Sequence, residues 1–148
     1  MHTSPTSLDL APALAPAGAT ADALEDLWQA LWAQPHVPAP VLELCRLRLA
    51  GLHGLAEETA LRHPAARLPE GKIAALLDGS FPRHPDFSPA ERAALDFAEI
   101  YFQDAKAISD ELAAEVSRYF GEPGLVALLT ALGHIDGRLR LARFFSHL

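Results

Sequence analysis

The chain has 148 residues, of which 50% are hydrophobic and 21% are charged, a composition typical of one folded domain and unlike that of a disordered chain. Its formal net charge is −7 and no stretch gathers the cations that phosphates attract, so we exclude nucleic acid and an anionic membrane surface as partners. The N-terminus lacks the basic start of a secretory signal, and no apolar run approaches the roughly 20 residues that cross a bilayer, so we expect a cytoplasmic protein.

The first segment, residues 1–20, is rich in Ala, Pro, Ser and Thr. Its three prolines exclude a long helix. We therefore expect a flexible or extended N-terminal arm that precedes a helical domain over residues 21–148. The alternative is that its leucines, Leu8, Leu10 and Leu14, dock on a neighbouring surface.

The next part of the chain has the apolar periodicity of helices. The pattern predicts a helix that begins near Asp22 and ends before the segment PHVPAP. A long helix is then expected from about Pro38 to His63, which Gly51 and Gly54 could bend near its middle. A short helix with proline near its first turn is expected over residues 69–77.

The last part of the chain carries clear signals for helix ends. Ser88 and Glu91 form an S-x-x-E capping box, which predicts a helix start. Ser109 caps the following helix, and Gly121 ends it. The last helix is expected over residues 123–145. Because no segment alternates Val, Ile and Thr as strands do, the sequence predicts an all-α fold of about six helices.

Three segments, ELCRLRLAGLHG, SPAERAALDFAEI and ISDELAAEVSRYFG, followed by a terminal helix that ends in RLRLARFF, resemble the carboxymuconolactone decarboxylase and alkylhydroperoxidase D-like superfamily. The resemblance covers about residues 22–146. Five residues of the first segment match the family pattern: Glu43, Arg46, Arg48, Ala50 and Gly54. The resemblance implies that the chain folds as the helical bundle of that superfamily.

The residues that carry peroxide chemistry in that family are absent. Aligned on Glu43, the two cysteine positions fall on Leu55 and Glu58, and the family histidine falls on Arg62. A thiol peroxidase needs one thiolate to attack oxygen and a second cysteine to resolve the sulfenic acid. The single cysteine, Cys45, lies on the apolar arc of its helix, where we expect a buried and inert thiol. We therefore expect a non-redox protein without a cofactor, and residual alkyl hydroperoxidase activity is the less favoured alternative.

The candidate site follows from the same alignment. We predict Glu43 and His53 as catalytic acid–base groups, because such chemistry on an organic acid needs a base and a cation that holds the carboxylate. The predicted substrate-binding residues are Glu58, Arg62 and His134. A solvated helix face is the alternative for the glutamates, and a packed helix histidine is the alternative for His134. Without an HExxH motif or a cysteine pair, we expect no metal site.

Two functions remain open at this stage. One is an enzyme, a carboxymuconolactone decarboxylase-like lyase that decarboxylates or isomerises a small organic acid. The other is a non-catalytic oligomeric scaffold or binding protein. The resemblance implies a homo-trimer or homo-hexamer. The sequence gives its own reason to expect a homo-oligomer, because the apolar arcs of its helices are too wide for a domain of this size to bury. We expect the terminal helix, LLTALGHIDGRLRLARFF, to form the contact.

Overall fold

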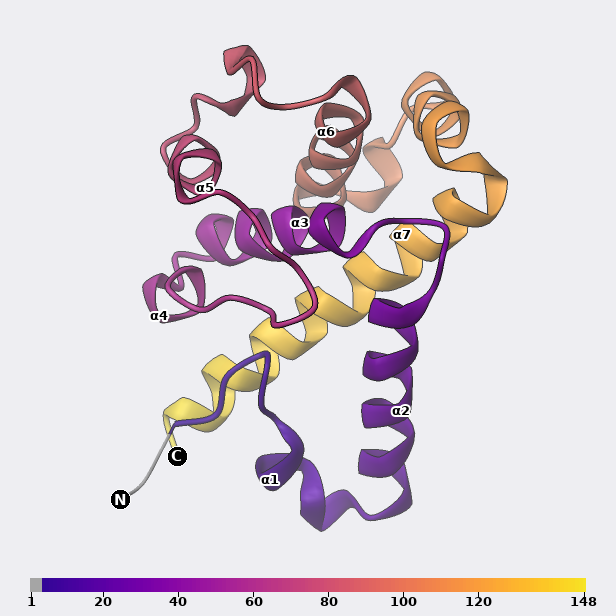
Figure 1. The fold of residues 1–148 in the computed structure, drawn as a ribbon. Helices are drawn as coiled ribbons and strands as arrows, with labels where there is room; N and C mark the ends of the chain where they lie inside the picture. Colours follow the sequence, from indigo (N-terminus) through magenta and orange to yellow (C-terminus); the bar gives the residue numbers. More distant parts are fainter. Residues whose placement is uncertain (1–3) are drawn as a thin grey trace.

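The computed structural model describes residues 4–148, which are helical apart from their connecting loops and one isolated bridge between Thr6 and Asp9 (Figure 1). The α-helices are α1 (Ala11–Leu14), α2 (Ala19–Ala33), α3 (Ala39–Leu52), α4 (Ala56–Thr59), α5 (Glu70–Leu77), α6 (Pro89–Gln103) and α7 (Asp110–Ser146). Three short 3-10 helices, η1 to η3, cover Ala15–Ala17, Phe81–Arg83 and Ala105–Ala107. The predicted all-α fold is confirmed for this part of the chain.

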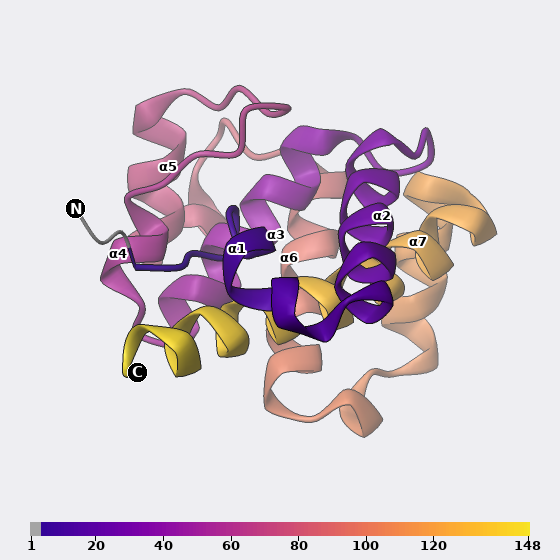
Figure 2. The same ribbon diagram turned by 90° about the horizontal axis from the view of Figure 1, so that it is seen from below.

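Helix α3 forms the centre of the bundle, and Figure 2 shows it surrounded by the other elements. From Val41 to Ala50 every residue except Arg48 is buried, and α5, α6 and α7 pack around them. One side of α3, with Leu42 and Leu49, packs in a core shared with α2, α6 and α7. The opposite side packs against α5 and α6 in a second core. A helix that is apolar on all sides belongs inside a protein.

The prediction of one long helix over Pro38–His63 is wrong in its last third. Helix α3 ends at Leu52, and the single turn of α4 follows after a break. Gly54 has a φ of 73°, and Leu55 N donates to Ala50 O at 2.9 Å. These are the features of a Schellman motif, in which a glycine in the left-handed region ends a helix. Because the helix ends here, the faces assigned to later residues from a continuous helix of 3.6 residues per turn are wrong.

The N-terminal segment is packed onto the domain, which differs from the expected flexible arm. Ser7 and Leu10 are both 0% exposed. Leu10 and Leu14 form a small core with the end of α7, beside which this segment runs in Figure 1. The prolines do limit helix length here, since α1 has only 4 residues. Residues 1–3 of the expected arm lie outside the described residues.

Helix α7 consists of two helical arms that meet at Gly121, where the sequence predicts a helix end. Gly121 has a φ of 75° and a ψ of 170°, and Pro123 follows at the start of the second arm. The second arm crosses the molecule against α3 and α6 and carries residues of the candidate site. Although α7 spans 37 residues, neither it nor another helix within residues 4–148 is apolar enough over a sufficient length to cross a membrane.

We expect Gly121→Ala to lower the free energy of unfolding by about 1–2 kcal/mol, because a side chain with a Cβ rarely adopts this backbone conformation. Gly137→Ala is the matched control in the same helix, since a Cβ there has no atom within 4 Å. That change should raise stability by about 0.5–1 kcal/mol, because alanine favours a helix interior. Urea denaturation followed by circular dichroism measures both. Equal effects of the two changes would contradict this role of Gly121.

Candidate functional site

His53 and Asp136 form a hydrogen-bonded pair where the end of α3 meets α7. His53 Nε2 lies 2.6 Å from Asp136 Oδ1, and the side chains are 12% and 16% exposed. His53 is the residue at which the Schellman motif ends α3, and its ring stands edge-on to Phe102. One turn along α7, Arg140 Nε donates to Asp136 Oδ2 at 2.8 Å. The Asp136 carboxylate is thus held from two sides and fixes the His53 ring. Sequence reasoning found His53 but missed this partner.

His53 lies on the wall of an open hollow of about 450 Å³, between the start of α4 and the last turns of α7. A second hollow of about 440 Å³ adjoins it. The residues that line both are His53, Leu55, Arg143 and His147. Within residues 4–148, the hydrogen bond of the His53 ring is made through Nε2, and Nδ1 forms none.

Glu43 belongs to a buried ion pair and does not line these hollows. It is 1% exposed, and its carboxylate accepts hydrogen bonds from Arg46 Nε at 2.5 Å and from the backbone N–H of His63 at 2.7 Å. Arg46 is 0% exposed and also donates to the backbone carbonyls of Glu58 and Leu61. The Glu43 carboxylate is therefore enclosed by the protein and does not lie on a solvated helix face. Glu43 neutralises Arg46 and holds the loop after α4 against α3.

Glu58 lines the larger hollow, but its carboxylate is engaged by the N-terminal segment. Ser7 N and Ser7 Oγ donate to its two oxygens at 2.7 and 2.6 Å. Arg46 Nη1 lies 3.5 Å from one of the same oxygens. On the other side of Ser7, Arg138 Nε donates to the Ser7 carbonyl at 2.7 Å, and Arg138 Nη1 pairs with Glu25 at 2.9 Å. Glu58 therefore ties the N-terminal segment to the core.

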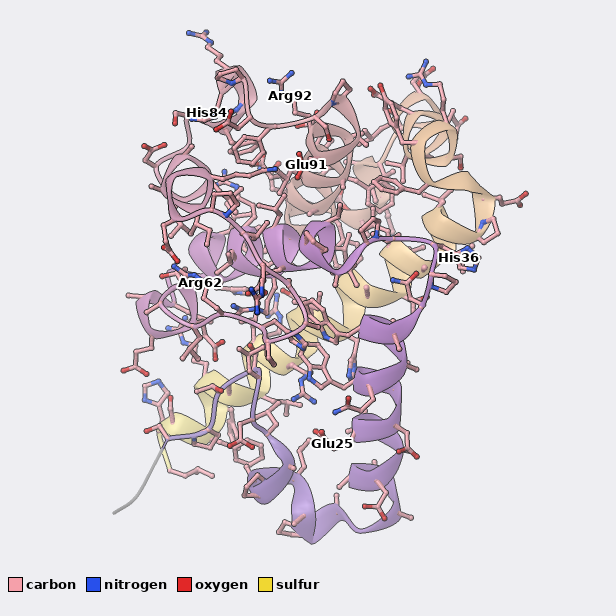
Figure 3. All side chains as sticks on the ribbon, in the orientation of Figure 1. Glu25, His36, Arg62, His84, Glu91 and Arg92 are labelled. Carbon is pink, nitrogen blue, oxygen red and sulfur yellow. The ribbon has the colours of Figure 1, made fainter. Side chains whose placement is uncertain are left out.

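Arg62 lies apart from His53. Figure 3 shows it beside α4, where its guanidinium donates to the backbone carbonyl of Thr59 at 2.5 Å and to the Glu70 carboxylate at 3.3 Å. Together with Glu43 it lines a separate depression of about 280 Å³. Of the five predicted site residues, the structure thus brings His53 and Glu58 to one hollow and Glu43 and Arg62 to another, while His134 lines neither.

Two histidines pack against the tryptophans of α2. The His63 ring stacks on Trp32 with centroids 3.6 Å apart, and the His134 ring lies 5.7 Å from that of Trp28. Burial lowers the pKa of both histidines. The positive charge of Arg138 adds to this effect at each of them. His134 is thus packed against α2, as in the alternative that the sequence left open, but its buried Nε2 has no hydrogen-bond partner within residues 4–148.

The remaining chemistry that the sequence raised also has a clear structural context. Cys45 is fully buried, and burial raises the pKa of its thiol from 9.0 to about 12, so it stays protonated near neutral pH. The expectation of a buried cysteine is confirmed. Within residues 4–148, His, Cys, Asp and Glu side chains form no group of three or more that could hold a metal ion.

Comparison with known proteins adds no family to this description. No protein-family model matches the chain, and no curated protein matches its sequence. The resemblance to the carboxymuconolactone decarboxylase superfamily therefore remains a prediction, which rests on the motif around Glu43 and on the order of the later helices.

We expect Glu43→Gln to lower the free energy of unfolding by about 3–5 kcal/mol, because it leaves the Arg46 guanidinium buried with too little compensating charge. Glu115→Gln is the control, since its pair with Arg118 is 3.8 Å long and exposed. That change should cost less than about 0.5 kcal/mol. Urea unfolding at neutral pH measures both. A Glu43 variant within about 1 kcal/mol of the parent would refute the structural role given to this ion pair.

Stability should fall as the pH is lowered below the ordinary histidine pKa of about 6.5, because His63 and His134 have lower pKa values when folded. The unfolded chain then binds protons that the folded chain does not, so the loss begins near that pH and ends below the folded pKa values. Replacing both histidines by phenylalanine should flatten the curve between pH 5 and 7.5. The exposed His36, replaced in the same way, is the control. An unchanged slope in the double variant would count against this origin.

Proposed function

We propose that this chain is a non-redox enzyme that performs acid–base chemistry on a small organic acid, with His53 as the base and Asp136 as its positioning residue. The observation that carries the proposal is the 2.6 Å contact between His53 Nε2 and Asp136 Oδ1 at the wall of a hollow. A carboxylate on one ring nitrogen favours the tautomer in which the other nitrogen accepts a proton, and it stabilises the imidazolium that results. Glu43 has no part in this proposal, since its carboxylate is engaged by Arg46.

The proposed chemistry is a proton transfer that needs no co-reactant. Nδ1 of His53 removes a proton from a carbon next to a carbonyl group, and the C–H electron pair forms the double bond of an enolate. The imidazolium then returns the proton at the far end of the conjugated system, so that a β,γ-unsaturated lactone becomes its α,β-unsaturated isomer. In a decarboxylation, the protonated form of His53 would act instead. The bond to the departing CO₂ breaks, its electron pair stays on carbon, and the imidazolium gives that carbon a proton and then takes one back from water.

The lining of the hollow supports an acid as the substrate. Arg143 and His147 line both hollows together with His53, and the smaller hollow has no acidic residue in its wall. A guanidinium is suited to hold a carboxylate through two parallel hydrogen bonds. Lactone isomerisation and decarboxylation are also the reactions that the resemblance to the carboxymuconolactone decarboxylase superfamily implies. Peroxide reduction has less support, because the only thiol, Cys45, is buried and protonated.

The second candidate is a non-catalytic oligomeric scaffold, and the exposed apolar residues of α7 favour it. Val126 and Phe144 are 59% and 60% exposed, and Leu129 is 45% exposed. Apolar side chains of this size on one helix are typical of a surface that packs against another copy. A homo-trimer or homo-hexamer would cover them. Sedimentation equilibrium would test this assembly, and a monomer at micromolar concentration would exclude it.

We expect the protein to isomerise 5-methyl-3H-furan-2-one, a β,γ-unsaturated lactone, or an analogue that carries a carboxylate. His53→Gln should lower kcat/KM by about 10²–10⁴-fold, because the base is removed. Asp136→Asn should lower kcat and shift the pH profile with little change in KM, while His36→Gln should change neither. The absorbance of the conjugated product gives the rate.

Two results would count against this function. Turnover that survives in His53→Gln would show that another group is the base. No turnover of either lactone by a folded oligomer would favour the scaffold. As a further check, turnover of hydrogen peroxide with a dithiol that is lost in Cys45→Ser would restore the peroxidase alternative.

A further inference from the structure

The two adjoining hollows differ in the charge of their walls. The smaller one, which we call the basic lobe, is lined by His53, Leu55, Leu139, Arg140, Arg143, Phe144 and His147. Four of these residues are basic, three are apolar, and none is acidic. The larger one shares His53, Arg143 and His147 with the basic lobe but adds Glu57, Glu58 and Ser146, and we call it the acidic lobe. In a chain whose formal net charge is −7, a hollow lined only by basic and apolar side chains is suited to an anion with an apolar body.

Arg143 is the cation best placed to hold that anion. It lies at the boundary, since it lines both lobes, and its side chain forms no ion pair or hydrogen bond within residues 4–148. Arg140 is less available, because its Nε already donates to Asp136 at 2.8 Å. A free guanidinium next to apolar walls offers two parallel hydrogen bonds to a carboxylate.

The apolar side of the basic lobe can take the body of the ligand. Leu139 is 0% exposed and forms a fixed part of the wall, whereas Phe144 is 60% exposed. An aromatic or aliphatic group placed between them would remove the Phe144 ring from water, which favours binding. Leu55, at the position aligned with a cysteine of the resembled family, adds a further apolar contact next to His53.

We propose that the ligand of this site is a monocarboxylic acid with an apolar body, that its carboxylate binds Arg143, and that its body occupies the basic lobe between Leu139 and Phe144. The reacting part then reaches past His53 toward the acidic lobe. There, the carboxylate of the exposed Glu57 disfavours a second negative charge on the ligand. This assignment of a ligand class rests on the proposed function, because both use the hollow beside His53.

The test is an NMR titration of the whole chain, at fixed salt, with phenylacetate and three comparison compounds. Phenylacetamide lacks the charge, acetate lacks the ring, and inorganic phosphate is an anion of another kind. We expect phenylacetate to bind about tenfold more tightly than each of them, since both the charge and the apolar body contribute. Arg143→Gln should remove that preference over phenylacetamide and leave the binding of phenylacetamide unchanged. Arg118→Gln, a 68% exposed arginine in the other arm of α7, is the matched control and should change nothing.

Each result separates the parts of the proposal. Equal binding of phenylacetate and phenylacetamide, or an Arg143 variant that keeps the preference, overturns the carboxylate assignment. Equal binding of phenylacetate and phosphate or acetate overturns the apolar body. Phenylacetate binding that depends on Arg143 in a chain without lactone turnover upholds the ligand class and refutes the acid–base function. Lactone turnover that depends on His53, without any preference for phenylacetate, upholds the acid–base function and refutes the ligand class.

Discussion

The arrangement of the molecule depends on one buried charge, the guanidinium of Arg46. A charge without exposure to water is very costly unless carboxylates and hydrogen bonds replace its hydration. Here Glu43 supplies the closest carboxylate at 2.5 Å, Glu58 supplies a second at 3.5 Å, and the carbonyl of Leu61 accepts a hydrogen bond at 2.8 Å. These partners come from α3, from α4 and from the loop after α4. The requirement to satisfy Arg46 therefore determines how the chain turns back after α3 ends.

A second buried arginine, Arg138, extends the same constraint to α7 and to the N-terminal segment. Its guanidinium lies 4.1 Å from the centroid of the Trp28 ring, donates to the carbonyl of Ser7, and pairs with Glu25. Figure 3 shows Glu25 between α2 and α1, on the side of α2 that faces this segment. Since Ser7 also donates to Glu58, it joins the two arginine networks. This connection explains why a segment rich in proline and alanine is packed and buried. It also holds α7 against the end of α3, which fixes the separation of the candidate base and its carboxylate.

Much of the fold could be predicted from local sequence, because helix ends have local causes. Ser88 and Glu91 form the predicted capping box, and Ser109 caps α7 through the N–H of Leu112. The end of α3 was missed, although Gly54 was identified, because a glycine in a periodic segment can bend a helix or end it and periodicity does not distinguish the two. The packing of the N-terminal segment was only the less favoured alternative, because its hydrogen bonds reach partners 51 and 131 residues away.

The candidate site was less predictable for the same reason. His53 and Asp136 are 83 residues apart, and no pattern along the chain links them. The one local signal was the spacing of Asp136 and Arg140 on one side of α7, which places a carboxylate and its partner one turn apart. Glu43 was chosen from the resemblance alone, and a motif cannot tell whether a buried glutamate serves a ligand or an arginine.

The two positions that align with the cysteines of the resembled family bear on the chemistry that we propose for the hollow. In the alignment on Glu43, the first cysteine position is Leu55, which lines both hollows, and the second is Glu58, whose carboxylate is bound by Ser7. A leucine and an engaged glutamate leave an apolar wall and no nucleophile at these positions. Of the polar residues that line both hollows, His53 is the one whose ring is paired with a carboxylate, that of Asp136. An imidazole in that position can move protons but cannot reduce a peroxide, which is why we propose acid–base chemistry for this hollow.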